Sequence, residues 1–312
     1  MAGERELREL RRPGWTFRFL AGNYDLYLMI LPALVLLFLF NYLPMYGAVI
    51  AFKDYNFMGG IQGSPWVGFT HFQRLFQERE FYRILRNTLL ISFYRIVFQF
   101  PLPILLAILL NEVGNMFFKR VVQTVTYMPH FLSWVIVGSL VIDLLSPNSG
   151  IINDACRSLG LPEITLMSKA SFRGIVVVSQ AWKETGWSAI IYLAAILSIN
   201  PELYEVAIVD GAGRLRQTWH ITLPGILTTI VFILLLRIGA LMSTDVEQIL
   251  MLYNPLVYET GDVIGTYVYR TGLGKMEFSY TTAIGLFQSV VGFVLLVGAN
   301  RVSRKYTNTG MW

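Results

Sequence analysis

Three basic side chains interrupt stretches of sequence that are otherwise apolar, and these residues are the best candidates for chemistry. Arg95, Lys183 and Arg237 each lie inside such a stretch, and Glu184 is the one acidic residue within these runs. Ionisable groups are costly in an apolar medium, so positions of this kind are candidates for function. A guanidinium binds a carboxylate through two parallel hydrogen bonds. A cavity lined by these cations would therefore bind an anionic substrate.

Six apolar stretches carry or surround these charges and must position them. They are residues 26–52, 87–111, 121–142, 174–199, 217–244 and 278–300. Each is long enough to cross a bilayer as a helix, which needs about 20 mostly apolar residues. Hydrophobic residues make up 54% of the chain and charged residues only 14%, which excludes a soluble enzyme, a disordered protein and a disulfide-bonded secreted domain. The sequence predicts an all-α, polytopic membrane protein with six transmembrane helices.

Basic residues near the two ends of the chain predict its orientation. They are Arg5, Arg8, Arg11, Arg12 and Arg18 before the first stretch, and Arg301, Arg304 and Lys305 after the last. Lys and Arg favour the cytoplasmic side of a membrane, so we expect both termini in the cytoplasm. The outer loops then cover about 53–86, 143–173 and 245–277, and we expect one surface helix over Thr70–Arg86. The net charge of +5 reflects this topology rather than binding to nucleic acid.

No catalytic or metal-binding motif accompanies the charges. The phosphate-binding loop G-x-x-x-x-G-K-[ST] is absent, because Gly274-Lys275 is followed by Met276. The three histidines lack the spacing of metal ligands, and the single cysteine, Cys156, cannot form an internal disulfide. We expect no enzymatic activity, no metal site and no cofactor in this chain.

The segment between the fourth and fifth apolar stretches has the features of a short interfacial helix. Asn200 can cap a helix that begins at Pro201 and runs to about Asp210. Gly211 then ends the helix and lets the chain turn. Small residues leave room for another protein, and Glu205 and Asp210 flank that surface. An ordinary loop between two helices is the alternative interpretation.

Three groups of residues in this region follow one another at the spacing of a known signature: Glu205-Val206-Ala207, then Gly211, then Ile221-Thr222-Leu223-Pro224. The segment resembles the EAA motif of permease subunits in bacterial binding-protein-dependent ABC importers, with Val206 in place of the first alanine. Stretches such as 41–47, 63–68 and 267–273 are similar to the complex-polysaccharide, lipoprotein-B-like branch of sugar permeases. Within that branch the sequence is similar to permeases of alginate-oligosaccharide importers.

The resemblance implies a domain organisation and a location. A type I ABC importer permease domain would cover 26–300, with its cytoplasmic coupling helix at about 201–213. A basic cytoplasmic segment, 1–25, would precede this domain, and a cytoplasmic tail, 301–312, would follow it. The chain would cross the bacterial inner membrane several times and contact its lipid.

The resemblance also implies partners and assigns roles to residues. Glu205, Ala207, Asp210 and Gly211 would couple the permease to one of two ATPase subunits, which would bind ATP and Mg²⁺ themselves. A homologous second permease and a periplasmic or extracellular solute-binding protein would complete the importer.

The implied function gives the charged residues within the apolar stretches a role. The candidates for the substrate path are Arg95, Gln180, Trp182, Lys183, Glu184, Trp187 and Arg237. They would bind an anionic, alginate-like oligosaccharide by ion pairing, stacking and hydrogen bonding. Alternatively, Glu184 pairs with one cation and the other cations extend to the membrane surface. A permease for a neutral oligosaccharide or another solute, and an ion-coupled secondary transporter, are the alternative functions.

Overall fold

The computed structural model describes residues 22–146, 150–162, 168–243, 246–307 and 310–311. These residues form helices and one isolated bridge between Lys53 and Trp66, without a longer strand, so the all-α prediction is confirmed. The chain divides into two compact units, residues 1–68 and 69–312. The basic residues predicted to orient the amino terminus lie outside the described residues.

The first unit is built on one long apolar helix. Its elements are α3 (Tyr24–Leu37), η1 (Phe38–Tyr42), α4 (Leu43–Met45), η2 (Tyr46–Phe52) and α5 (Gly60–Gly63). The first four form a continuous run of 29 residues that matches the first predicted span. The ring of Phe52 stacks on Trp66 with 5.7 Å between the ring centroids, which closes the loop after this run.

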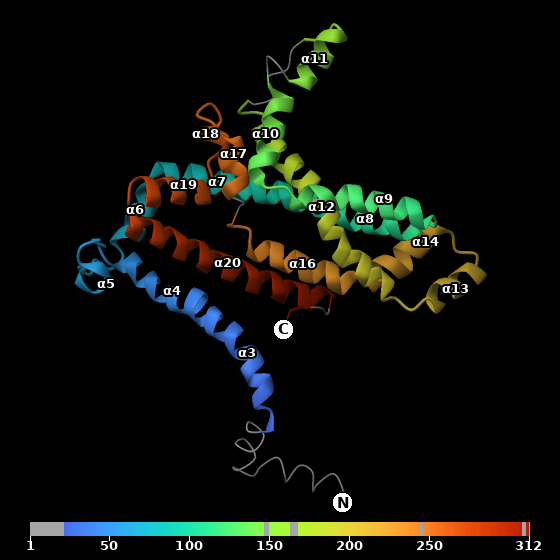
Figure 1. The fold of residues 1–312 in the computed structure, drawn as a ribbon, viewed down its shortest axis with the longest axis horizontal. Helices are drawn as coiled ribbons and strands as arrows, with labels where there is room; N and C mark the ends of the chain where they lie inside the picture. The colour runs from blue at the N-terminus through green and yellow to red at the C-terminus, as the bar shows by residue number, and fades with distance from the viewer. Residues whose placement is uncertain (1–21, 147–149, 163–167, 244–245, 308–309, 312) are drawn as a thin grey trace, which may run out of the picture. The chain divides into compact units, whose positions relative to one another are not determined.

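The second unit contains the remaining helices (Figure 1). Those of its first half are α6 (Thr70–Gln77), α7 (Arg79–Tyr94), η3 (Arg95–Gln99), α8 (Pro101–Glu112), α9 (Met116–Tyr127), η4 (Met128–Phe131), α10 (Trp134–Leu145), α11 (Ile151–Ser158) and α12 (Phe172–Leu197). Those of its second half are α13 (Glu202–Val209), α14 (Arg214–Gln217), η5 (Thr218–Thr222), α15 (Leu223–Gly225), α16 (Leu227–Gly239), α17 (Val246–Leu252), α18 (Tyr258–Gly261), α19 (Ile264–Tyr269), η6 (Arg270–Gly274) and α20 (Phe278–Thr307).

Three described helices are long and apolar enough to cross a membrane alone: Tyr24–Phe52, Arg79–Glu112 and Phe278–Lys305. Three pairs of helices, each bent at a short break, raise the number to as many as six. These positions match the six predicted stretches. Two stretches are not single straight helices. Within 217–244, α16 is bent by 60° from the helix that ends at Gly225. Within 121–142, α10 is bent by 102° from the helix that ends at Phe131. Ser133 begins the new direction by capping α10 through the N–H of Ile136.

The predicted surface helix over Thr70–Arg86 is also two helices. Glu78 has extended backbone angles (φ −78°, ψ 119°), so α6 ends at Gln77 and α7 begins at Arg79. The carboxylate of Glu78 accepts hydrogen bonds from the hydroxyls of Tyr267 and Tyr280, both at 2.8 Å. The break therefore places a carboxylate between α19 and α20, and residues 79–86 extend the second span.

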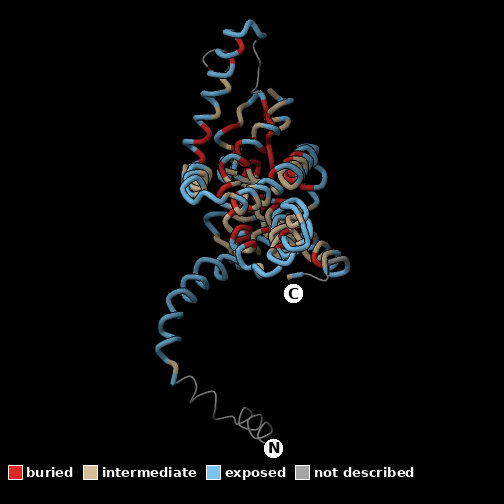
Figure 2. Tube along the Cα trace, turned by 90° about the vertical axis from the view of Figure 1, so that its right-hand side faces the viewer, coloured by how far each residue is buried: buried red, intermediate tan, exposed pale blue. Residues whose placement is uncertain are grey.

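Buried apolar side chains form three clusters inside the second unit, where Figure 2 shows the buried residues gathered. The first surrounds Tyr280, the second surrounds Phe172, and the third surrounds Tyr192. The third cluster joins α8 and α12 to Ile226, just before α16. In Figure 1, α12 packs along both α8 and α9, and α16 packs along α20. This packing brings η3, α8, α12 and α16 around a common space.

Candidate functional site

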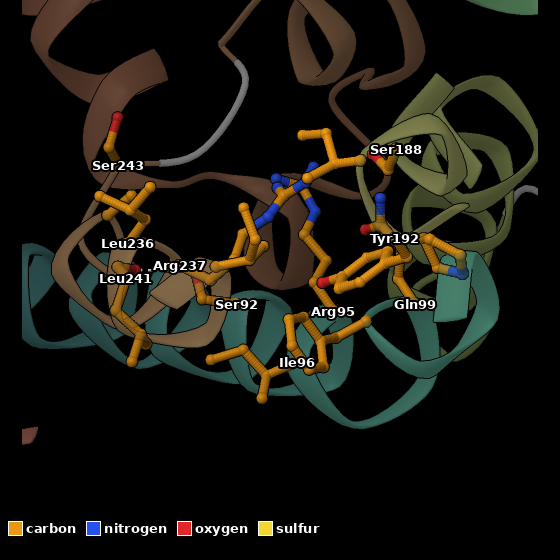
Figure 3. Close-up of a pocket in the computed structure, with 15 residues that line it drawn as sticks. Ser92, Arg95, Ile96, Gln99, Ser188, Tyr192, Leu236, Arg237, Leu241 and Ser243 are labelled. Carbon is orange, nitrogen blue, oxygen red and sulfur yellow. Dashed lines mark hydrogen bonds between the residues drawn. The ribbon is translucent and has the colours of Figure 1, made fainter. Parts of the chain in front are cut away.

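A cavity of about 440 Å³ lies between η3, α8, α12 and α16 (Figure 3). Its polar lining residues are Ser92, Arg95, Gln99, Ser188, Tyr192, Arg237 and Ser243. Among the described residues that line it there is no Asp or Glu. Figure 3 shows the guanidinium groups of Arg95 and Arg237 close together in the middle of this space. Two of the predicted cations are therefore brought together in a cavity whose described lining contains no acidic side chain.

A π turn in the second span carries Arg95 and Gln99 to the cavity. The N–H of Phe100 donates to the carbonyl oxygen of Arg95 at 3.0 Å, five residues earlier. Pro101 follows and has no N–H with which to continue the pattern. Single π turns of this kind occur frequently at functional sites. Gln99 is buried, and its Oε1 has no hydrogen-bond partner within the described part of the chain.

Arg237 reaches the cavity from the last turn of α16. The carbonyl end of a helix favours a positive charge, which lowers the cost of a cation at this position. No ion pair joins Arg237 to a carboxylate in the part of the chain that the structure describes. Because its side chain lines the cavity, a ligand bound there would lie close to its charge.

Lys183 and Glu184 belong to a second cluster that does not line the cavity. The Nζ of Lys183 donates to the carbonyl oxygen of His130 at 2.6 Å and lies 3.7 Å from the Oε1 of Glu184. The Oε2 of Glu184 lies 3.0 Å from the Nδ1 of His130, whose ring stacks on Trp187 with 4.6 Å between centroids. The structure thus separates Lys183 from the two arginines and gives it Glu184 as an ion-pair partner.

The two remaining candidates on α12 lie outside the cavity lining as well. Gln180 is buried, and its Oε1 finds no hydrogen-bond partner among the described residues. Trp182 is 51% exposed within this chain. Neither contributes to the space that contains Arg95 and Arg237.

Sequence reasoning missed the polar residues around the arginines: the lining residues Ser92, Gln99, Ser188, Tyr192 and Ser243, and Gln248 behind Arg95. Gln99 could have been found, because it follows Arg95 by four residues and so shares its helix face. Tyr192 could not have been singled out, because one tyrosine in an apolar stretch does not indicate a binding site. Gln248 accepts a hydrogen bond from Arg95 but lies outside the predicted spans, so only the folded chain brings it to the site.

The coupling segment is helical as expected, with small shifts at its ends. The helix α13 runs from Glu202 to Val209 and follows α12 after a bend of 72°. The side chain of Asn200 accepts from the N–H of Glu202 at 3.1 Å, so it caps this end although the helix starts one residue later than predicted. Gly211 turns the chain with a φ of +74°, a value that favours glycine.

The four predicted coupling residues occupy one accessible end of the molecule's second unit. Glu205, Asp210 and Gly211 are exposed and Ala207 is partly exposed. Val209 beside them is 87% exposed although it is apolar. An exposed apolar surface flanked by acidic groups is suited to contact with another protein.

The described residues contain no group of three or more His, Cys, Asp or Glu side chains that could hold a metal ion. The described lining of the cavity offers two guanidinium groups, the amide of Gln99 and several hydroxyls, which bind charged and hydroxylated molecules. These groups are suited to binding a solute along a path.

A family model for the inner membrane component of binding-protein-dependent transport systems matches residues 99–308. The chain belongs to this family. It is therefore a permease, a transport subunit without catalytic chemistry of its own, and a multi-pass protein of the inner membrane. The ion-coupled secondary transporter is set aside by this membership.

Curated relatives of the permease cover nearly its whole length. Protein LplB of Bacillus subtilis (strain 168) is 45% identical over 92% of this chain and 91% of its own. The polygalacturonan/rhamnogalacturonan transport system permease protein YteP of the same strain is 48% identical over 92% of this chain and 90% of its own.

Solved structures show the same fold. A chain in the crystal structure of a bacterial alginate ABC transporter, in complex with an alginate pentasaccharide-bound periplasmic protein, has a TM-score of 0.87 and 43% identity. The match covers 95% of the permease and 100% of that chain. A second structure, of a bacterial ABC transporter involved in the import of the acidic polysaccharide alginate, has a TM-score of 0.86. The family model and the solved structures therefore agree that this chain is a transport permease with this fold.

Proposed function

We propose that this permease forms part of the translocation path of an ABC importer for acidic oligosaccharides, in which Arg95 and Arg237 bind the carboxylates of uronate residues. The observation that carries the proposal is the placement of these two arginines in one cavity without a described acidic lining residue. Two guanidinium groups held close together repel each other. An anionic group of the substrate would relieve that repulsion and accept hydrogen bonds from the guanidinium groups.

The relatives support an acidic sugar as the substrate class. One permease with 48% identity is named for polygalacturonan and rhamnogalacturonan, and a solved transporter with 43% identity is described for alginate. These polymers contain uronate residues, so each repeating unit can carry a carboxylate. The two arginines of the cavity in this permease are complementary in charge to a uronate unit.

The importer also needs partners. In our proposal two ATPase subunits bind ATP and Mg²⁺, and α13 contacts one of them through Glu205, Ala207, Asp210 and Gly211. Both termini and α13 lie in the cytoplasm. A homologous second permease encloses the other side of the path, and an external solute-binding protein delivers the oligosaccharide. The exposed apolar residues of α13 support this contact, because they have no partner surface within the described part of the chain.

ATPase activity of the complete complex tests the substrate class. The complex is purified through this permease with its second permease, ATPase subunits and binding protein, and reconstituted in liposomes. An alginate tetrasaccharide and maltotetraose are the acidic and neutral probes. We expect stimulation by the acidic probe, and an increase of about tenfold in its KM for Arg95→Gln and for Arg237→Gln, because each removes one charge-assisted pair. Arg301→Gln, at an exposed site far along α20, is the matched control.

Two results would contradict this proposal. Equal stimulation by maltotetraose would favour a permease for neutral oligosaccharides. An unchanged KM for the acidic probe in both arginine variants would show that the cavity does not bind the carboxylate.

A further inference from the structure

Gln248, on α17, makes hydrogen bonds with both atoms of its side-chain amide: one with Arg95 in the cavity and two with residues of α12. Its Oε1 accepts a hydrogen bond from the Nη2 of Arg95 at 2.5 Å. Its Nε2 donates to the carbonyl oxygen of Val176 at 2.7 Å and to the Oγ of Ser179 at 2.9 Å. Gln248 is completely buried. Gln248 therefore connects α17 to Arg95 through its Oε1, and its Nε2 is held by two oxygen atoms of α12.

The chemistry of these contacts requires an amide. One acceptor must face the guanidinium and two donors must face oxygen atoms, and only Asn and Gln side chains supply both. A glutamate at position 248 would pair more strongly with Arg95, but it would neutralise the cation and turn an oxygen toward the carbonyl of Val176. A leucine would fill the same space and leave the guanidinium without this contact.

The hydrogen bond fixes one end of a flexible side chain. An arginine has many rotamers, and a guanidinium held by a buried partner loses less conformational freedom when it binds a ligand. Gln248 contacts one terminal nitrogen of Arg95, while the same guanidinium lies in the cavity next to Arg237 (Figure 3). The contact therefore helps to set the direction in which the guanidinium of Arg95 faces the cavity.

We infer that Gln248 is a positioning residue that orients Arg95 for the carboxylate of the substrate and makes this orientation depend on the placement of α17. The inference rests on the proposed function of the cavity. Because α17 lies in the segment after the fifth span, a displacement of α17 would break the hydrogen bond between Gln248 and Arg95 and change how Arg95 is held. Substrate affinity and the position of α17 are thus linked through one amide.

A double-mutant cycle in the reconstituted complex tests the inference, with the KM for alginate tetrasaccharide as the measurement. We expect Gln248→Leu to raise the KM by about fivefold with little change in maximal rate, because the cation remains but is no longer oriented. In the Arg95→Gln background the same change should have no further effect. Gln248→Glu should reduce the preference for the acidic probe over maltotetraose, because it neutralises the cation.

The control is Gln288→Leu, since Gln288 on α20 also donates to a backbone carbonyl, that of Met242 in the turn after α16 at 2.7 Å, but this hydrogen bond does not involve Arg95. It should leave the KM unchanged. If Gln248→Leu does not assemble, Ser179→Ala replaces it, because this change removes one support of the amide and keeps the contact with Arg95. We expect it to raise the KM by about twofold in the wild-type background only.

The outcomes separate the inference from the proposed function. An increase in KM for Arg95→Gln without one for Gln248→Leu or Ser179→Ala would overturn the inference and leave the substrate proposal intact. Equal increases from Gln248→Leu in both backgrounds would also overturn it, because Gln248 would then act independently of Arg95. No increase for Arg95→Gln or Arg237→Gln would overturn the proposed function.

Discussion

The carboxylate of Glu78 accepts a hydrogen bond of 2.8 Å from the hydroxyl of Tyr280, 202 residues further along the chain. Tyr267 donates a second one at 2.8 Å, and Arg74 pairs with the same carboxylate at 2.9 Å while lying over the ring of Tyr280. Burial raises the pKa of Glu78, but the hydrogen bonds from Tyr280, Tyr267 and Arg74 outweigh it and hold the pKa below its usual value. Glu78 therefore acts as a carboxylate that ties α6 and α7 to α19 and α20.

We expect this tie to weaken in acid. A carboxyl group with a lowered folded-state pKa stabilises the fold above its unfolded-state pKa of about 4.3, and this contribution is lost as the pH falls through the folded-state value. Glu78→Gln should lower the free energy of unfolding by about 1 kcal/mol at neutral pH, allowing for its partial exposure. Thermal unfolding in detergent should show the difference from wild type shrinking between pH 7 and pH 3. A difference that grows in acid would contradict the assignment, and Glu80→Gln is the exposed control.

Gly186 allows α12 to pack directly against α9. A Cβ at this position would overlap the carbonyl carbon and oxygen of Thr126, which are backbone atoms and cannot rotate away. We expect Gly186→Ala to separate the helices and destabilise the permease by about 1–3 kcal/mol, as overpacking does elsewhere. Gly298→Ala is the control, because nothing lies within 4 Å of its added methyl group. The free energy of unfolding of both variants is measured in detergent. If Gly186→Ala were as stable as Gly298→Ala, α12 would not approach the backbone of Thr126 as closely as the structure shows.

Lys183 is 6% exposed and depends on Glu184 as its counter-ion. Glu184→Gln should therefore cost about 3 kcal/mol, because it leaves a buried charge without its partner. The double variant Lys183→Met/Glu184→Gln should be more stable than this single variant, since it removes both charges. Glu259→Gln breaks the exposed pair with Lys169 and should cause no measurable change. If the double variant were as unstable as the single one, the pair would not explain the burial of Lys183.

The sequence was sufficient to predict the class of fold and the spans, because apolar length is a property of each segment alone. The prediction of one helix over Thr70–Arg86 was wrong because the extended backbone of Glu78 accompanies contacts with residues about 200 positions away. The depth of Lys183 in its span could be calculated from helix rise, but its direction around the helix axis depends on packing against η4. The same limit hid Gln248, which lies outside the apolar stretches and meets Arg95 only in the folded chain.

In our proposal, α13 couples the permease to an ATPase subunit. The N–H of Ala212 donates to the carbonyl oxygen of Ala207 at 2.8 Å, and Gly211 has a φ of +74°, so the helix ends in a turn that favours glycine. This turn fixes the exposed surface that contains Glu205. We expect Glu205→Lys to abolish the substrate-stimulated ATPase activity of the complex, because it reverses the charge at the contact.

Glu202→Lys is the matched control, since Glu202 is an exposed acid on the same helix but outside the signature. It should retain most of the stimulation. Gly211→Ala should reduce stimulation partially, because the strain of about 1 kcal/mol at a positive φ shifts the turn without removing the charge. Equal loss in Glu202→Lys and Glu205→Lys would indicate a general effect of charge on α13. Full stimulation in Glu205→Lys would place the ATPase contact elsewhere, because a reversed charge at a docking surface cannot be neutral to docking.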